Sequence, residues 1–380
     1  MRSFSKPISR ITPLPDEASK LRRLANVHWG PLAATLLLAL IGLATVNSAS
    51  AELGTDYLPR QATWVVVGCL AILVVFRFGY HLLVDSSPLL YGFGLFLLVL
   101  VLIIGQERGG ARSWLVFGPF TAQPSEFTKL ATALLLCHIL AKVQGPFLSL
   151  REILISVLTV AVPMVLIVLE RDLGNAAMYL PMLAGVLLVG GVRFRQLLIA
   201  ALLGLVLAAG LWTFGMRDYQ RQRVLTFLSP DSDPLGAGYQ LRQSKIAVGS
   251  GQWWGRGYGQ GTQSQLRFLP ERHTDFVMAV LAEEWGFLGA LTVLGLYGLY
   301  IFSAAQIAIR ARDRAGILLV TCLLSVFTFH VLYNTAMVIG LLPITGIPLP
   351  YLSYGGSFTL VNFLATGLIL NVDYRRYVNR

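Results

Sequence analysis

Long apolar segments, separated by short polar connections, run along the whole chain of 380 residues. A helix that crosses a bilayer needs about 20 mostly apolar residues, and ten segments approach or reach that length. The pattern therefore predicts an all-α, polytopic membrane protein with about ten transmembrane helices. Some helices must extend into their polar flanks, and eight or nine spans remain the alternative if a short segment re-enters. The expected spans are Pro31–Ala49, Ala62–Phe76, Pro88–Ile104, Thr128–Ala141, Ile153–Leu169, Ala176–Gly190, Gln196–Phe214, Trp285–Ile309, Gly316–Leu342 and Ser357–Val372.

Composition and charge agree with this pattern. Hydrophobic residues make up 55% of the chain, charged residues 13%, and the mean hydropathy is +0.67, which is unlike an ordinary soluble domain. With both termini in the cytoplasm, the cytoplasmic segments hold 17 basic and 6 acidic residues, an excess equal to the net charge of +11. This is the positive-inside distribution. The high pI therefore reflects membrane sidedness, and no nucleic-acid partner is expected.

The spans divide the chain into three parts. Residues 1–29 are expected to be a cytoplasmic tail, residues 30–372 the transmembrane domain, and residues 373–380 a second cytoplasmic tail. We expect the first span to be an uncleaved anchor, because no cleavable apolar stretch precedes it. The three cysteines fall within apolar spans and predict no disulfide framework. The five histidines show no metal-ligand spacing.

The longest polar connection is 215–274, a large extracytoplasmic loop between spans seven and eight. Loops of that length in compact proteins are usually functional. We expect a short helix at Gln240–Val248 and irregular backbone in the glycine-rich remainder. The basic residues of the loop either form a solvated face or bind a phosphate-bearing lipid head group. They are Arg217, Arg221, Arg223, Arg242, Lys245 and Arg256.

Ionisable residues crowd the end of this loop, directly before the eighth span. They are Glu271, Arg272, His273 and Asp275. Such groups are costly to keep at the mouth of a membrane helix and commonly belong to a substrate or ion site. The structural alternative is that Thr274 or Asp275 is the N-cap of the next helix. Glu283 and Glu284 follow about 12 Å further along a helix, which makes a purely structural role less satisfactory.

Three further polar clusters adjoin other spans. Within Gln123–Lys129, Glu126 and Lys129 lie on one helical face, where they either fix the helix start or line a polar cavity. Asp172 either caps the sixth span or belongs to a polar site. The segment Gly340–Ser357 is uncharged, and its prolines and glycines exclude a regular helix. It is expected to form a re-entrant wall of an outward-facing pocket.

These motifs together resemble the SEDS family, the shape, elongation, division and sporulation proteins. The form of Gly346–Pro350 is similar to that of the rod-shape branch of the family. The chain departs from the family pattern at Ser113, Arg171, Asn175, Gln252 and Arg256, and this leaves the role of Arg112 open. The resemblance covers nearly the whole chain and rests on Gln123–Glu126 with Lys129, Asp172–Gly174, Asp233 with Gly238–Gln240, Gly261–Gln263, Leu269–Glu271 with His273–Asp275, and Pro350–Ser357.

The resemblance implies a peptidoglycan glycosyltransferase that polymerises lipid II on the outer face of the bacterial cytoplasmic (inner) membrane during cell elongation. It implies that Asp275 is the essential aspartate, which we interpret as the general base, and that Glu126–Lys129 is an ion pair in the substrate site. Positive charge for the departing pyrophosphate is expected from Lys129, Arg112, Arg221 and Arg223. The other substrate-binding candidates are Gln123, Asp172, Lys245, Glu271, His273 and Ser353.

The implied chemistry also suggests cofactors and partners. A divalent cation, Mg²⁺ or Mn²⁺, is a candidate to share the leaving-group charge, and no organic cofactor is expected. The implied partners are lipid II, the undecaprenyl-pyrophosphate-linked glycan, a class B penicillin-binding protein and other elongation-complex proteins. The eighth span has a small-residue surface, for that partner's helix or for neighbouring helices of the chain itself. It consists of Gly286, Gly289, Ala290, Gly295 and Gly298, and Gly286 and Ala290 form a pair of small residues four apart.

Two other functions remain open for the sequence. One is a flippase or transporter of the lipid-linked precursor, and the other is a non-catalytic scaffold for cell-wall enzymes. A transporter should carry polar residues along a path to both sides of the membrane. The polar clusters here lie almost wholly on the outer side, which favours surface chemistry.

Overall fold

A computed structural model describes residues 26–51, 57–108, 110–117, 120–196, 198–199, 202, 210, 221, 226–227, 229, 236–266 and 268–376. These residues are mostly helical. The main helices are α2 (Gly30–Ser50), α3 (Tyr57–Phe78), α4 (Tyr80–Asp85), α5 (Ser87–Ile104), α6 (Pro124–Ala141), α7 (Leu150–Leu169), α8 (Leu173–Ala177), α9 (Tyr179–Gly190), α12 (Ala237–Ser250), α13 (Thr262–Gln265), α14 (Val277–Arg310), α15 (Arg314–Val338) and α16 (Gly356–Arg375).

A small antiparallel sheet connects α5 to α6. Its strands are β1 (Gln106–Arg108), β2 (Ala111–Phe117) and β3 (Phe120–Ala122), in the order β1-β2-β3. The prediction of a helical, polytopic membrane fold is confirmed, and the sheet is an addition that the apolar pattern did not indicate.

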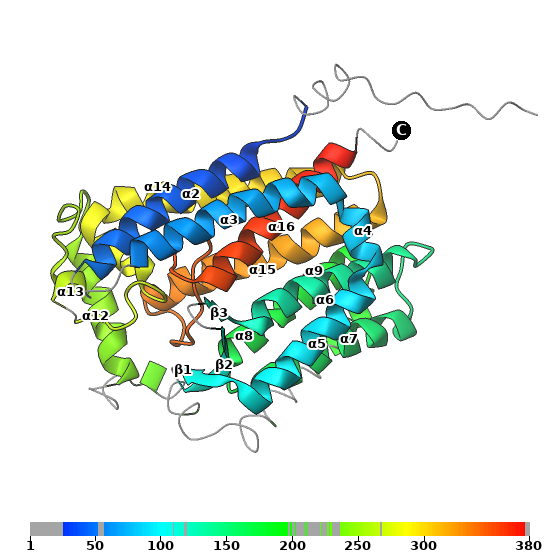
Figure 1. The fold of residues 1–380 in the computed structure, drawn as a ribbon, viewed down its shortest axis with the longest axis horizontal. Helices are drawn as coiled ribbons and strands as arrows, with labels where there is room; N and C mark the ends of the chain where they lie inside the picture. Colours follow the sequence, from blue (N-terminus) through cyan, green and yellow to red (C-terminus); the bar gives the residue numbers. More distant parts are fainter. Residues whose placement is uncertain are drawn as a thin grey trace, which may run out of the picture.

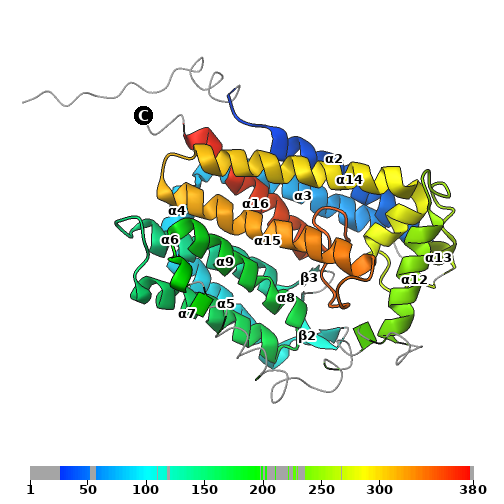
Figure 2. The same cartoon turned by 180° about the vertical axis from the view of Figure 1, so that it is seen from behind.

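The long helices lie side by side in two groups (Figure 1). One group holds α2, α3, α14, α15 and α16, and the other holds α5, α6, α7 and α9, as the view from behind also shows (Figure 2). The groups are joined where α15 packs against α6 and α9. Helices α12 and α13 lie at the end of the bundle away from α4 and the last turn of α16. The described part of the loop expected outside the membrane and the end of α16, which is expected in the cytoplasm, therefore lie at opposite ends of the bundle.

Eight helices in the described part of the chain are long and apolar enough to cross a membrane. They are α2, α3, α5, α7, the α8–α9 pair (Leu173–Gly190), α14, α15 and α16, and each coincides with an expected span. The expected fourth span corresponds to α6, which has 18 residues and carries a buried ion pair. The expected seventh span, Gln196–Phe214, lies almost wholly outside the described residues. The total of ten spans therefore stays a prediction.

The helix and the irregular backbone expected within residues 215–274 are confirmed where the structure describes them. The short helix anticipated at Gln240–Val248 is α12, and the glycine-rich stretch after it is irregular until α13. Residues 341–355 form no helix, as the prolines and glycines there predicted. This non-helical stretch is named the 341–355 segment below.

The glycine-rich stretch wraps around a kink in α14. Gly286 has φ 69° and ψ −166° inside the helix, a backbone conformation that is essentially restricted to glycine. Across the kink, the amide of Gly257 donates to the carbonyl of Glu284 at 3.0 Å, and the amide of Phe287 donates to the carbonyl of Gln252 at 2.7 Å. A Cβ atom on Gly286 would lie only 2.3 Å from the backbone nitrogen of Gly255. The loop and α14 therefore fit together only because this position has no side chain.

We expect Gly286→Ala to destabilise the protein by at least about 1–3 kcal/mol, since the new methyl group meets both backbone strain and overlap. Gly298→Ala on the same helix is the matched control, because its Cβ would meet nothing within 4 Å. That control should leave the thermal midpoint unchanged or slightly higher, because alanine is the better helix former. Equal midpoints for the two purified variants would refute this account of the kink.

Candidate active site

Asp275 lies in a tight turn directly before α14. The amides of Thr274, Asp275 and Phe276 all point at the carbonyl of Glu271, at 3.1, 3.0 and 3.3 Å. Glu271 itself has φ 49°, a left-handed conformation that closes the turn. The N-cap of α14 is Phe276, and it has no side-chain capping bond. The alternative in which Thr274 or Asp275 is the N-cap is therefore wrong. The side chain of Asp275 is half-buried.

The 341–355 segment lies against this turn. A Cβ atom on Gly346 would stand 3.5 Å from Oδ2 of Asp275, so the aspartate side chain faces that glycine. The amide of Tyr354 donates to the carbonyl of His273 at 2.9 Å. The turn before α14 and the 341–355 segment thus meet beside the carboxylate of Asp275, although they are far apart in the sequence.

His273 is held by aromatic rings on the same side. Its ring centroid is 4.7 Å from that of Tyr57 and 5.8 Å from that of Tyr354. Burial lowers the pKa of His273, because removal from water disfavours the charged imidazolium. The imidazole is therefore neutral at pH 7, and it can accept or donate a hydrogen bond without adding charge beside Asp275.

A second polar cluster begins at the start of α6. Nζ of Lys129 donates to Oε1 of Glu126 at 2.8 Å and to Oδ1 of Asn175 at 3.1 Å. The side-chain amide of Asn175 in turn donates to Oδ2 of Asp172 at 2.8 Å, and the amide nitrogen of Gln123 donates to the same oxygen at 2.9 Å. Asp172 also accepts from the backbone amide of Asn175 and so caps α8, as one of its two interpretations predicted. These five residues form one continuous network.

A small cavity of about 40 Å³ lies beside this network. That volume is enough for a water molecule. The cavity is lined by Glu126, Lys129 and His330 among others, and Nδ1 of the buried His330 lies 3.1 Å from the carbonyl oxygen of Pro348. Pro348 belongs to the 341–355 segment, which also faces Asp275. His330 on α15 therefore lies between the cavity of the ion pair and the segment that faces Asp275.

The remaining predicted residues are placed around these two clusters. Arg112 is exposed on β2, and its guanidinium is 3.4 Å from the carbonyl oxygen of Leu102. Lys245 is exposed on α12, and its side chain lies over Gly340. A Cβ atom added to Gly340 would stand 2.0 Å from Cε of Lys245. Arg221 is half-buried, and Arg223 lies outside the described residues.

Two other predicted residues make contacts within the protein. Glu271 is exposed and accepts from the hydroxyl of Thr274 at 3.2 Å. Ser353 is fully buried, and its hydroxyl is engaged by backbone groups of Thr274 and Leu349. Its contacts in the structure are therefore with the protein.

The carboxylates deeper in α14 anchor the loop. Glu283 accepts from the amides of Gln263 and Ser264 at 2.9 and 3.2 Å, which fixes the start of α13. Glu284 accepts from the hydroxyl of Ser48 on α2. Arg272, also buried, donates to the carbonyls of Ala49 and Ser264. Glu283, Glu284 and Arg272 thus hold the loop against α14 and α2, which explains why these charged residues lie close to Asp275 in the sequence.

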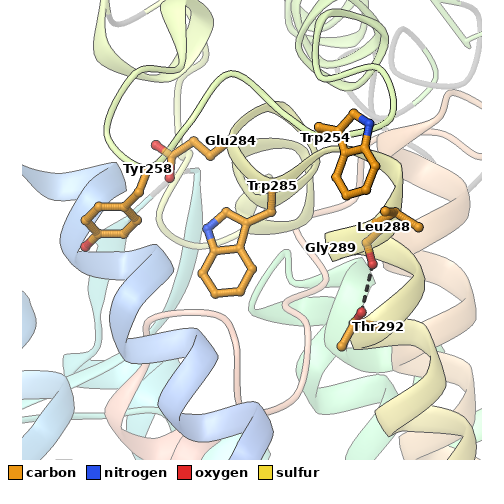
Figure 3. Close-up of a pocket in the computed structure, with 7 residues that line it drawn as sticks. All are labelled: Trp254, Tyr258, Glu284, Trp285, Leu288, Gly289 and Thr292. Carbon is orange, nitrogen blue, oxygen red and sulfur yellow. Dashed lines mark hydrogen bonds between the residues drawn. The ribbon is translucent and has the colours of Figure 1, made fainter.

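A larger pocket of about 410 Å³ opens beside the kink of α14 (Figure 3). It is lined by Trp254, Tyr258, Glu284, Trp285, Leu288, Gly289 and Thr292. Gly286 packs against the backbone of the glycine-rich loop, whereas Gly289 lines this pocket. Of the small-residue surface of the eighth span, Gly286 therefore packs within the protein, whereas Gly295 and Gly298 are exposed. Binding of a partner to this surface stays a prediction.

Comparison with known proteins decides the family. A family model described as "cell cycle protein", which covers FtsW, RodA and SpoVE, matches residues 29–378. The chain belongs to this family, the SEDS proteins. The peptidoglycan glycosyltransferase MrdB of Escherichia coli K12 is 38% identical over 363 residues, which cover 95% of this chain and 98% of MrdB.

Solved structures similar to this chain support the same family assignment. A chain from a structure titled as showing coordination of polymerization and crosslinking by a peptidoglycan synthase complex matches with a TM-score of 0.81 and 31% identity, over 93% of this chain and 99% of that one. The rod shape determining protein RodA of Thermus thermophilus matches with a TM-score of 0.70 and 29% identity, over 93% of this chain and 98% of RodA.

Sequence reasoning missed two residues of this SEDS protein that lie at the centre of the site. His330 and Asn334 are one turn apart on α15, and both bond to carbonyls of the 341–355 segment. A histidine and an asparagine on one face of an otherwise apolar span were a detectable signal, because polar side chains in a membrane helix need a partner.

Glu170 is a buried carboxyl group in this SEDS protein, between α7 and α8. Both of its carboxylate oxygens are buried and have no hydrogen-bond partner among the described residues. Burial, with the negative charge of Asp172 as a second cause, raises the pKa of Glu170 to about 8. The folded protein therefore holds a proton here that an unfolded chain releases near the ordinary value of 4.5.

The stability of the protein should consequently fall as pH rises from about 4.5 to about 8, because over this range the folded state binds more protons than the unfolded state. Glu170→Gln, which keeps the shape and carries no charge, should remove this part of the pH dependence. Thermal midpoints of both proteins at about pH 5 and about pH 8 measure the effect. A slope that is the same in the variant would show that Glu170 does not titrate in this range.

Proposed function

We propose that this chain is a peptidoglycan glycosyltransferase that polymerises lipid II into glycan strands during cell elongation. The observation that carries the proposal is the end-to-end similarity to MrdB, which is named a peptidoglycan glycosyltransferase. The site supports it, because the half-buried carboxylate of Asp275 faces the 341–355 segment. The buried Lys129–Glu126 pair shares a small cavity with His330, whose ring bonds the same segment.

The reaction is a displacement at an anomeric carbon. The bond between that carbon and the pyrophosphate oxygen breaks, and a bond to a sugar hydroxyl of the acceptor forms. Asp275 takes the proton of that hydroxyl as general base. Lys129, Arg112, Arg221 and Arg223 are the proposed source of positive charge for the departing pyrophosphate. A single displacement of this kind converts an α-linked donor into a β-linked product.

A divalent cation can take part in this reaction without a dedicated metal site in the protein. Among the described residues no group of three or more histidine, cysteine, aspartate or glutamate side chains could hold a metal ion. We therefore propose that Mg²⁺ or Mn²⁺, when it takes part, is held by one or two carboxylates and mainly by phosphate oxygens of the substrate. Its chemistry there would be to share the negative charge of the leaving group.

Purified protein and labelled lipid II provide the test. We expect the chain alone, in detergent, to convert lipid II into a ladder of glycan strands on a gel. Lipid II that stays monomeric with a folded protein would refute the proposal. Labelling of a cysteine placed at Arg256 by an impermeant reagent checks the orientation, since we propose that the outer loop and Asp275 face away from the cytoplasm across the inner membrane.

A crosslinking partner is the second part of the proposal. The structural match to a peptidoglycan synthase complex that coordinates polymerization and crosslinking supports it. We propose that the partner is a class B penicillin-binding protein and that the two act with other elongation-complex proteins. Co-purification with the cognate penicillin-binding protein is expected, and its absence in both detergent and membranes would count against the partner.

A further inference from the structure

The backbone carbonyls of His273, Thr274 and Asp275 each accept a hydrogen bond from a donor in a distant part of the chain. The carbonyl of His273 accepts from the amide of Tyr354 at 2.9 Å. The carbonyl of Thr274 accepts from the hydroxyl of Ser353 at 2.5 Å. The carbonyl of Asp275 accepts from the side-chain amide of Asn334 at 2.8 Å.

Asn334 ties two pieces of backbone together. The same Nδ2 atom that bonds Asp275 also donates to the carbonyl of Ile347 at 2.8 Å, and the side chain is completely buried on α15. Ser353 is completely buried as well, and its hydroxyl accepts from the amide of Leu349 at 2.8 Å. Both side chains therefore join the turn before α14 to the 341–355 segment, and neither has surface left for a ligand.

We propose that Asn334 and Ser353 are positioning residues that fix Asp275 for proton transfer from the acceptor hydroxyl. This inference rests on the proposed glycosyl transfer. A general base must stand within hydrogen-bond reach of the proton it takes, and a misplacement of about 1 Å can cost about 10²-fold in rate. The turn that carries Asp275 closes on the single carbonyl of Glu271. Its backbone needs outside support, which these two side chains provide.

The chain contains a matched control for the structural part of this role. Asn371 on α16 is also completely buried, and its side-chain amide also donates to two backbone carbonyls, those of Val75 and Phe76 at 3.1 and 3.4 Å. It lies by α4 at the other end of the bundle, where its Oδ1 accepts from the amide of Tyr80 at 2.9 Å. Loss of Asn371 should cost at least as much stability as loss of Asn334, because it also leaves the amide of Tyr80 unpaired. Of the two, only Asn334 touches the turn of Asp275.

The experiment compares Asn334→Leu with Asn371→Leu, because leucine has nearly the shape of asparagine and lacks its donors. Polymerisation of lipid II is measured at varied substrate concentration, and thermal midpoints are recorded for each protein. We expect Asn334→Leu to lower kcat by about 10- to 100-fold with little change in KM. We expect Asn371→Leu to lower the thermal midpoint at least as much as Asn334→Leu does, while its kcat stays near the wild-type value. Asn334→Gln, which keeps the amide, should recover part of the lost rate.

A double variant separates positioning from a general loss of structure. Effects of residues that act through one group are not additive. Asn334→Leu should therefore reduce the residual rate of an Asp275→Ala protein no further. Ser353→Ala gives the same test at the neighbouring carbonyl if Asn334→Leu does not fold.

The outcomes are distinguishable. A wild-type rate in Asn334→Leu, an equal loss of kcat in Asn371→Leu, or a further multiplicative loss in the double variant would overturn the positioning role alone. Absence of polymer with the wild-type protein would instead overturn the proposed function, and this inference with it.

Discussion

Replacing Asp275 by alanine or asparagine is expected to lower the rate of lipid II polymerisation by about 10²- to 10⁴-fold, the usual contribution of a general base. The physical reason is that the acceptor hydroxyl then has no group to take its proton at the turn before α14. The Asp275→Asn variant is the stricter of the two, because it keeps the shape of the side chain and removes only its basicity. The rate is measured with purified protein and labelled lipid II.

Asp85→Asn is the matched carboxylate control. Asp85 is exposed at the end of α4 and its contact is an ion pair with His138 at 3.7 Å, so its loss should leave the rate unchanged. An Asp275→Asn protein that folds and polymerises at the normal rate would show that Asp275 is not the base.

Breaking the buried ion pair should have the largest effect on stability. Lys129→Met leaves the carboxylate of Glu126 almost completely buried, at 2% exposure, without its cationic partner. Removing one member of such a pair costs about 3–5 kcal/mol, because the remaining charge is uncompensated. We therefore expect a large drop in the thermal midpoint of Lys129→Met, or a loss of folded protein in membranes.

The double variant Glu126→Gln/Lys129→Met tells stability apart from chemistry. It removes both charges, so the midpoint should return toward that of the wild-type protein. Polymerisation should stay low, because the double variant still lacks the lysine proposed for the pyrophosphate. A double variant with normal stability and normal rate would limit the pair to a structural role. A Lys129→Met protein as stable as wild type would contradict the ion-pair account.

The helices could be predicted from the sequence because a membrane span is a local property. About 20 apolar residues in a row need no long-range information, and eight helices of this kind lie where the pattern put them. The sheet of β1, β2 and β3 was missed, because its strands are short and pair only with one another. The expected eighth span began at Trp285, whereas α14 begins at Val277, because the charges of Glu283 and Glu284 interrupt the apolar run although both lie in the helix. Their partners on α13 and α2 explain how the helix holds these charges.

The candidate site could be predicted in part for the same reason. The charges around Asp275 and the spacing of Glu126 and Lys129 are local signals, and the structure pairs the second two as expected. The contacts of Asn334 and Ser353 with the Asp275 turn cross 59 and 79 residues of sequence. Contacts over such distances depend on how whole helices pack, and a single sequence contains no direct signal for them.

Whether Asp275 catalyses polymerisation is tested by reconstituting the wild-type protein and Asp275→Asn in liposomes with labelled lipid II. Polymer and lipid II transferred across the bilayer are measured in the same vesicles. We expect glycan strands with the wild-type protein, few or none with Asp275→Asn, and no acceleration by either protein of the transfer of lipid II across the bilayer. Rapid transfer of lipid II without polymer, at the same rate in both proteins, would contradict this expectation.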